Sequence, residues 1–178
     1  PSLYHAVVGL DFDGGADRAS RRFGFRWFEV VGKGGDDPYF RLNGRRIVLL
    51  GGMSWGFWPV NGVFATEEMA ARDVNVAKQL GLNYMNFHRA IGQPGLMDEG
   101  DERGMLMYEE PGGYSCEGAD PGQTLWREWR RIKLLRMVKR DRSRPSLFMY
   151  NLQNRTPNPV SDEDIANLRA ARGIDPTR

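Results

Sequence analysis

The sequence has very few residues of the kinds that form disulfides and metal clusters. It contains one cysteine, Cys116, and two histidines, His5 and His88, among 178 residues. A single cysteine excludes a disulfide within the chain and a cysteine-built metal cluster, and two histidines argue against a histidine metal site. We therefore expect neither a metal nor a cofactor. The cysteine count leaves the cellular compartment undetermined.

Long apolar runs and a strong charge of one sign are also missing. No apolar segment approaches the roughly 20 residues that cross a bilayer, so we expect no membrane partner. The net charge of +2 at pH 7 is too small to indicate a polyanionic partner. Hydrophobic residues make up 40% of the chain and charged residues 27%, which is typical of a folded domain. Because the sequence begins with Pro1 instead of methionine, we expect a fragment of a longer protein.

The first 38 residues predict the end of a β domain followed by a linker. Two short β-type runs, 3–10 and 23–31, surround a polar turn at 11–22 that is rich in glycine and aspartate. Two strands cannot bury a sandwich core by themselves. We interpret them as the last hairpin of an immunoglobulin-like sandwich. The segment GKGGDDP at 32–38 is a break in composition and the predicted linker.

Beyond the linker, the sequence predicts a hairpin and then alternating helices and strands. Asn43-Gly44 is the strongest short hairpin signal, between arms at 39–42 and 46–51. Thr66 and Ser161 are suited to cap the first and the last helix. The later strands are predicted at 83–88, 105–109 and 146–153, and the helices at 66–80, 94–103, 125–140 and 162–172.

This alternation of strand and helix indicates a parallel sheet. Four βα units are predicted, whereas a complete (β/α)8 barrel has eight units in about 250 residues. The predicted fold class is therefore α/β, the N-terminal half of a TIM (β/α)8 barrel preceded by the last strands of an immunoglobulin-like β-sandwich domain. We expect the sandwich strands at 1–34 and the half-barrel at 35–178.

Polar and aromatic residues follow the predicted strands. Side chains at the carboxyl ends of parallel strands share a crevice, where α/β enzymes place their sites. Aromatic faces beside polar groups suit sugars, which have apolar C–H faces and hydroxyls that need directional hydrogen bonds. The candidates are Ser54 and Trp55 after the first strand, His88 and Arg89 after the second, Glu109 and Glu110 after the third, and Asn154 and Arg155 after the fourth. Ordinary packing is the alternative for Trp55.

The adjacent carboxylates of Glu109 and Glu110 cannot both face this crevice. Neighbouring residues on a strand point to opposite faces of the sheet. A retaining glycosidase also needs its two carboxyl groups about 5 to 5.5 Å apart across the scissile bond, which neighbours on one strand do not provide. The pair is therefore not a catalytic dyad. One of the two can bind substrate, and a helix cap or a salt bridge is the alternative.

The basic segment at 127–144, REWRRIKLLRMVKRDRSR, has two interpretations. Its lysines and arginines, interleaved with tryptophan, are compatible with nucleic-acid binding that would depend steeply on salt. However, Trp129, Ile132, Leu135 and Val138 recur at helical spacing, which predicts an amphipathic helix with a charged outer face. We favour the amphipathic helix and expect no nucleic-acid partner.

Several short segments, in order along the chain, resemble glycoside hydrolase family 2, the group of β-galactosidases, β-glucuronidases and β-mannosidases. The segment at 141–154, DRSRPSLFMYNLQN, is similar to the family's "rDrNHPSi..WslgNE". The others are FGFR at 23–26, YFRLNGRRIVLLGG at 39–52, LMDEGDERG at 96–104 and DPTR at 175–178. None of these segments is specific alone, but together they cover nearly the whole chain.

The resemblance implies roles for four positions. The family has its catalytic acid/base glutamate after the fourth barrel strand, and Arg155 stands there in this chain. Asn154 matches the preceding asparagine, which hydrogen-bonds the 2-hydroxyl of the sugar. One of Glu109 and Glu110 matches a glutamate after the third strand, and we take Glu110 as the candidate substrate-binding residue. One of Trp55 and Trp58 is expected to contact the sugar, and Trp55 is the candidate. The family nucleophile follows a later strand and is not in this chain.

The resemblance is imperfect after the first two barrel strands. The family's "R.sH" falls on Asn86 and Arg89, so His88 is one place off and matches only if a bulge intervenes. Ser54 and Gly56 stand where the family has "N.H". His88 and Arg89 remain substrate-binding candidates.

By this resemblance, the complete protein would hydrolyse a β-glycoside with retention, and its partner would be that carbohydrate substrate. We expect the 178 residues alone to be inactive. The alternative is a non-catalytic carbohydrate-binding relative, which the substitution at Arg155 favours. The oligomeric state, the sugar and the linkage are not predicted.

Overall fold

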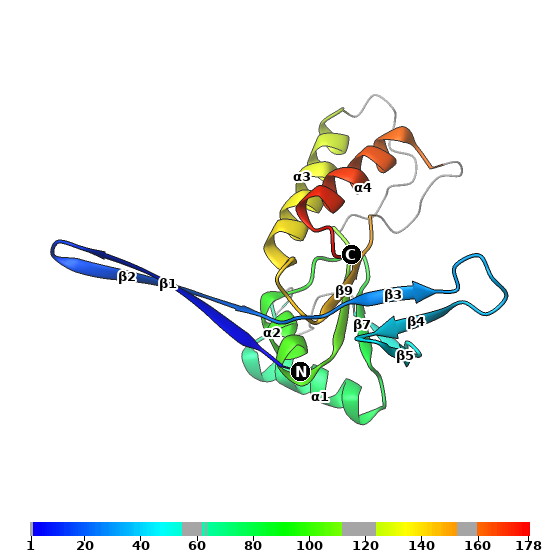
Figure 1. Cartoon of the computed structure of the whole chain (residues 1–178), viewed down its shortest axis with the longest axis horizontal. Coiled ribbons are helices and arrows are strands. Elements are labelled where there is room, and N and C mark those ends of the chain that lie inside the picture. Colours follow the sequence, from blue (N-terminus) through cyan, green and yellow to red (C-terminus); the bar gives the residue numbers. More distant parts are fainter. Residues whose placement is uncertain (1, 55–61, 63, 112–123, 153–159) are drawn as a thin grey trace.

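The computed structural model describes residues 2–54, 62, 64–111, 124–152 and 160–178. Antiparallel strands come first along the chain, and parallel strands alternating with helices follow (Figure 1). The predicted α/β class is confirmed at this level. Within the described residues, no helix combines the length and the apolar character needed to cross a bilayer.

A long two-stranded ribbon projects from the rest of the molecule (Figure 1). It consists of β1 (Tyr4–Phe12) and β2 (Gly15–Phe23), which pair antiparallel along their whole length. The prediction of a turn spanning 11–22 was wrong. The chain reverses over two residues, Asp13-Gly14, where Gly14 has a φ of 95° that favours glycine. The residues of β2 have weak β propensity, so their sequence alone did not predict a strand. They form one because they pair with β1.

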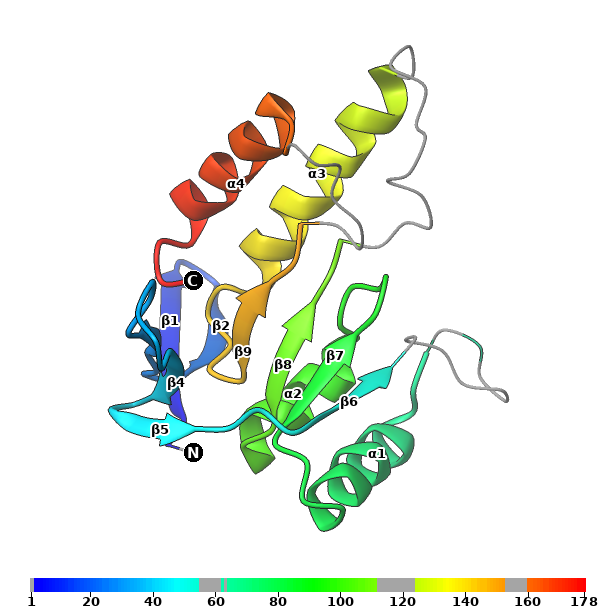
Figure 2. The same cartoon turned by 90° about the vertical axis from the view of Figure 1, so that its right-hand side faces the viewer.

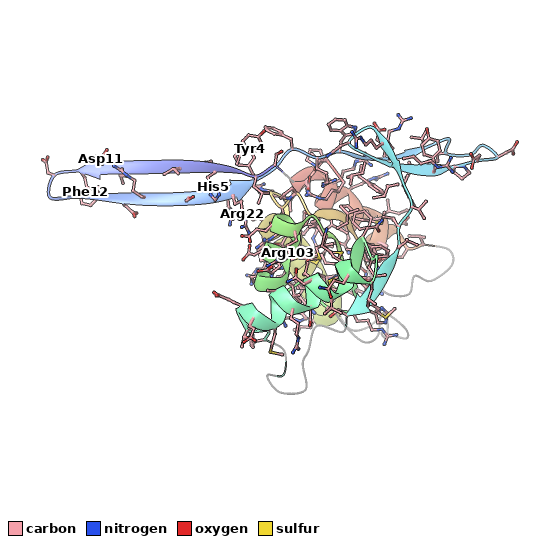
Figure 3. The ribbon with its side chains drawn as sticks, turned by 90° about the horizontal axis from the view of Figure 1, so that it is seen from below. Tyr4, His5, Asp11, Phe12, Arg22 and Arg103 are labelled. Atoms are coloured by element: carbon pink, nitrogen blue, oxygen red, sulfur yellow. The ribbon has the colours of Figure 1, made fainter. Side chains whose placement is uncertain are left out.

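The base of the ribbon is held to the body by ion pairs from Arg22. Its guanidinium lies 2.5 Å from Glu102 and 2.7 Å from Asp98, both on α2 (Pro94–Arg103). Figure 3 shows Arg22 where the ribbon meets this helix. Further out, large apolar side chains such as Val8 and Leu10 are exposed.

A second antiparallel sheet has the order β3–β4–β5, formed by Phe28–Val31, Tyr39–Leu42 and Arg45–Ile47. The predicted Asn43-Gly44 turn is confirmed, because both residues have positive φ, 49° and 80°. The expected linker at 32–38 is the loop between β3 and β4, and these two strands pair with each other. The division into domains at 1–34 and 35–178 stays a prediction.

Four parallel strands form the central sheet, in sequential order (Figure 2). They are β6 (Gly51–Ser54), β7 (Tyr84–Phe87), β8 (Leu106–Glu109) and β9 (Leu147–Tyr150). The first parallel strand was predicted too early, at 46–51, because residues 46 and 47 pair with β4 instead. A Cβ added to Gly51 would lie 2.1 Å from the ring of Tyr84, so the strand begins where only glycine fits.

A helix follows each parallel strand, as predicted. The helices are α1 (Glu67–Gln79), α2, α3 (Thr124–Asp141) and α4 (Asp162–Ile174). Thr66 Oγ1 accepts a hydrogen bond from the amide of Met69, and Ser161 Oγ accepts one from the amide of Asp164, which confirms both predicted caps. Gly104 ends α2 in the left-handed region, at a φ of 70°.

The two faces of the parallel sheet have different neighbours. One face packs against α1 and α2 and forms the main core, which includes Phe87, Met107, Leu147, Val74 and Leu96. The other face carries aromatic side chains. The ring of Phe148 lies 5.0 Å from Phe28 on β3 and 5.9 Å from Tyr84. These contacts join the antiparallel sheet β3–β4–β5 to the parallel one.

Candidate functional site

The structure brings together three of the predicted site residues, His88, Arg89 and Glu110. Glu110 Oε2 accepts a hydrogen bond from the backbone N–H of Arg89 at 3.0 Å. Glu110 Oε1 lies 3.7 Å from His88 Nδ1, and the Glu110 side chain is only 4% exposed. The amide of Glu110 donates in turn to the carbonyl of Ala90 at 3.2 Å. This carboxylate therefore fixes the turn that follows β7.

The chain reverses directly after His88. The amide of His88 donates to the carbonyl of Ser54 at 2.8 Å, which continues the pairing of β7 with β6. Arg89 then has a φ of 57°, in the left-handed region that non-glycine residues rarely adopt. The β6–β7 register runs without interruption up to Phe87. No strand bulge therefore moves His88 into the register that the family histidine would require.

Two further polar side chains face the same side of the sheet, Tyr108 and its partner in register, Asn86. Burial, then the negative charge of Glu110, then Tyr84 raise the pKa of Tyr108 to about 12, so its hydroxyl is a protonated donor at neutral pH. Asn86 Oδ1 is buried and has no hydrogen-bond partner among the described residues. Sequence reasoning named Asn86 only as a substituted family position and did not pair it with Tyr108. The period of two along β7 and β8 was the signal that could have found it.

Glu109 points to the opposite face, as the alternation along β8 predicts. Its Oε2 accepts a hydrogen bond from the amide of Gly92 at 3.0 Å and lies 3.6 Å from Arg140 Nη2. A Cβ on Gly92 would lie 3.1 Å from this oxygen, so glycine permits the close approach. Arg140 Nη2 also donates to the carbonyl of Gly92 and pairs with Asp141 at 2.6 Å. Glu109 and Arg140 thus hold the turn after β7 from the face of the sheet opposite to Glu110.

Glu109 and Asp141 are both fully buried acids. Burial, followed by the charge of Asp141, raises the pKa of Glu109 to about 8, against the opposing effects of Arg140 and the Gly92 amide. At neutral pH, Glu109 is therefore mostly a neutral acid. Its partners Arg140 and Asp141 lie on α3, the helix whose charges were predicted to face solvent. Sequence reasoning therefore missed this contact.

Trp55, Asn154 and Arg155 lie outside the described residues, and their roles stay predictions. Across the ranges that are described, no three side chains of the His, Cys, Asp or Glu type are grouped so that they could hold a metal ion. The described groups can donate and accept hydrogen bonds through Tyr108, Asn86, His88 and Glu110. Directional hydrogen bonding of this kind suits a polyhydroxylated ligand.

Relatives with similar sequences align with nearly all of this chain. A putative β-glucuronidase from Formosa agariphila is 30% identical over 185 aligned positions, which cover 100% of this chain and 17% of the relative. A β-galactosidase from Thermoanaerobacter pseudethanolicus is 29% identical over 167 positions, covering 93% of this chain and 21% of the relative. The chain thus spans about a fifth of the length of these relatives. No protein-family profile matches it.

Solved structures agree with these sequence matches. The apo structure of Bacteroides uniformis β-glucuronidase 3 superposes with a TM-score of 0.80 at 27% identity, covering 99% of this chain and 23% of that one. A glycosyl hydrolase family 2 member from Bacteroides cellulosilyticus superposes with a TM-score of 0.76 at 25% identity, covering 99% and 24%. The family resemblance seen in the sequence motifs is confirmed. The chain is homologous to glycoside hydrolase family 2 along its whole length.

Proposed function

We propose that the protein containing this chain hydrolyses the O-glycosidic bond of β-glycosides with retention. The observation that carries the proposal is the alignment of the whole chain with relatives named β-glucuronidase and β-galactosidase. Retention requires two carboxyl groups, one acting as nucleophile and the other as acid/base. We infer that the nucleophile comes from a part of the protein other than these 178 residues.

Within this proposal, the chain supplies the first half of a TIM barrel at 35–178 and the last strands of an immunoglobulin-like sandwich at 1–34. Four parallel strands in sequential order, each followed by a helix, support the half-barrel. Such barrels carry their sites at the carboxyl ends of the strands. His88, Arg89 and Glu110 follow the ends of β7 and β8, which is the edge where the substrate would bind.

Each site residue has a proposed task in binding the sugar. Asn154 hydrogen-bonds the 2-hydroxyl, and Trp55 offers an apolar face to the ring. Glu110 accepts a hydrogen bond from a sugar hydroxyl, or it holds His88 and Arg89 in place so that these two residues bind the sugar. Its carboxylate already contacts both residues. Tyr108 and Asn86 add a donor and an unsatisfied acceptor on the same side of the sheet.

The second candidate is a carbohydrate-binding relative without catalysis. Arg155 favours it, because arginine replaces the residue that would transfer the proton. Ser54, Gly56 and Asn86 favour it as well, because they replace other residues of the family pattern. The complete gene product should be incubated with a panel of 4-nitrophenyl β-glycosides and with unmodified disaccharides. Release of a β-configured sugar supports the enzyme, whereas saturable sugar binding without release supports the binding protein.

Replacing Asn154 with alanine should lower kcat/KM, or sugar affinity in a binding protein, by about 10²-fold. In the proposed role, the substitution removes a directional hydrogen bond to the sugar ring, so the melting temperature should change far less than the affinity. Asn75→Ala, on the partly exposed surface of α1, is the matched control and should leave both quantities unchanged. Unchanged kinetics and affinity in Asn154→Ala would show that this strand end does not line the sugar site.

A further inference from the structure

A hollow with almost entirely basic walls lies between the base of the β1–β2 ribbon and the end of α3. Its volume is about 550 Å³, and we call it the basic hollow. It is lined by Arg21, Arg136, Lys139, Arg140, Arg142 and Ser143. Five of the six lining residues are cations and none is an acid. The hollow adjoins the segment that leads into β9, whereas His88 and Glu110 follow the ends of other strands.

The carboxylates nearest the basic hollow are already paired with arginines. Among the described residues, Asp98, Asp101 and Asp141 all pair with Arg144, at 2.8, 2.9 and 3.0 Å, and Glu109 lies 3.6 Å from Arg140. Arg22 also pairs with Asp98, at 2.7 Å, and Arg140 with Asp141, at 2.6 Å. These acids therefore pair with Arg22, Arg140 and Arg144, and not with the other cations that line the hollow.

Four cations of the basic hollow are left over by this pairing, Arg21, Arg136, Lys139 and Arg142. Within the described ranges, their side chains have no ion pair and no hydrogen bond. Cations gathered in one concavity repel one another, and a concave wall focuses their potential inward. The end of α3 offsets only a fraction of one charge through its helix dipole. An anion in the hollow would relieve this repulsion.

We propose that the basic hollow binds a phosphate or sulfate group, either as a free ion or carried on a larger molecule such as a sulfated oligosaccharide. Arginine matches the geometry of such oxyanions, because its guanidinium donates paired hydrogen bonds. A water molecule in the liquid occupies about 30 Å³, so the hollow has room for an oxyanion together with the group that carries it. The site is additional to the sugar site and does not require that the protein hydrolyse glycosides.

The test measures binding of inorganic phosphate and of a sulfated tetrasaccharide to the complete gene product by calorimetry and thermal shift. Sodium chloride at equal ionic strength is the reference. Binding should saturate, and the double variant Arg136→Gln/Lys139→Gln should bind at least ten-fold more weakly. The control variant Arg169→Gln/Arg172→Gln removes the same charge from the exposed surface of α4 and should bind like wild type.

The possible results distinguish a free ion from a carried group, and they also include results that would overturn the proposal. Tighter binding of inorganic phosphate supports a free ion, and tighter binding of the tetrasaccharide supports a carried group, provided that only the Arg136→Gln/Lys139→Gln variant loses it. A response that chloride reproduces, or equal losses in both variants, overturns the proposal. Tighter binding of a duplex DNA oligonucleotide than of both probes also overturns it, in favour of a nucleic-acid surface.

Discussion

Replacing Arg155 with glutamate should increase hydrolysis of an unactivated β-glycoside by the complete gene product about 10²- to 10⁴-fold. This range is what positioned proton transfer contributes to catalysis. The acid/base residue gives a proton to the leaving oxygen and later takes one from water. Arginine stays protonated in proteins and cannot do either. The prediction rests on the resemblance of the segment at 141–154 to the family motif, which implies that Arg155 stands where the family has its acid/base glutamate.

Substrates with different leaving groups provide the control for the Arg155 prediction. The leaving group of a 2,4-dinitrophenyl glycoside departs as a phenolate without being protonated. Wild type should therefore already hydrolyse this substrate if the nucleophile is present. Arg155→Glu should therefore narrow the gap between activated and unactivated substrates, and Arg155→Ala should not. No gain with Arg155→Glu in a protein that still binds the sugar would show that the motif resemblance does not locate the acid/base position.

Robust wild-type hydrolysis that Arg155→Ala does not change would mean that another residue supplies the proton. Glu110 is the first to test, because its carboxylate is buried beside His88 at the edge of the sheet where the substrate would bind. Glu110→Gln keeps an acceptor oxygen for the Arg89 amide but cannot transfer a proton. Loss of activity in that variant alone would transfer the acid/base role to Glu110.

Local signals in the sequence predicted the elements of this fold well. The Thr66 and Ser161 caps and the Asn43-Gly44 turn each depend on a few neighbouring residues, and all three are confirmed. Strand partners depend on distant residues, and there the predictions failed. Residues 15–23 have little β propensity but pair with β1 along nine residues. Ile47 is apolar enough for the parallel sheet, yet it pairs with Phe40 in the antiparallel one.

The candidate site shows the same division between local and distant information. Alternation along β8 correctly separated Glu109 from Glu110, because period two is a property of the strand itself. The partners of the two carboxylates were not predictable in this way. Arg140 belongs to a strongly charged helix, which favours solvent exposure, but it reaches the carbonyl of Gly92 and lies beside Glu109. Only the packing of α3 against the sheet brings these groups together.

The buried acid pair has a measurable consequence for stability against pH. The pKa of Glu109 is raised from its usual 4.5 to about 8 in the folded protein, by burial and then by Asp141. Between these two values, the folded state holds a proton that the unfolded state has released. The free energy of unfolding therefore falls as pH rises, by up to about 1.4 kcal/mol per pH unit for one proton. This stabilisation is fully present below pH 4.5 and is lost as pH rises through about 8.

Replacing Glu109 with glutamine should flatten this pH dependence. Glutamine keeps an oxygen that accepts from the Gly92 amide, but it has no proton to lose, so the buried site stays neutral at every pH. The melting temperature of the complete gene product should fall more from pH 5 to pH 8 in wild type than in Glu109→Gln. In wild type, hydrogen exchange of the peptide containing Gly92 should accelerate with pH by more than the intrinsic chemical rate does, because the contacts that hold this turn weaken. Glu109→Gln should not show this extra acceleration.

Two further variants separate the effect of the acid pair from a general effect of charge. Asp141→Asn removes the neighbouring charge that raises the folded-state pKa of Glu109, so the loss of stability should end at a lower pH and be smaller in total than in wild type. Glu99→Gln removes a carboxylate that pairs with Arg103 on the partly exposed side of α2, and it should keep the wild-type slope. A slope in Glu109→Gln equal to that of wild type would mean that other groups titrate over this range, and the Glu109–Asp141 pair would then have no part in the pH response.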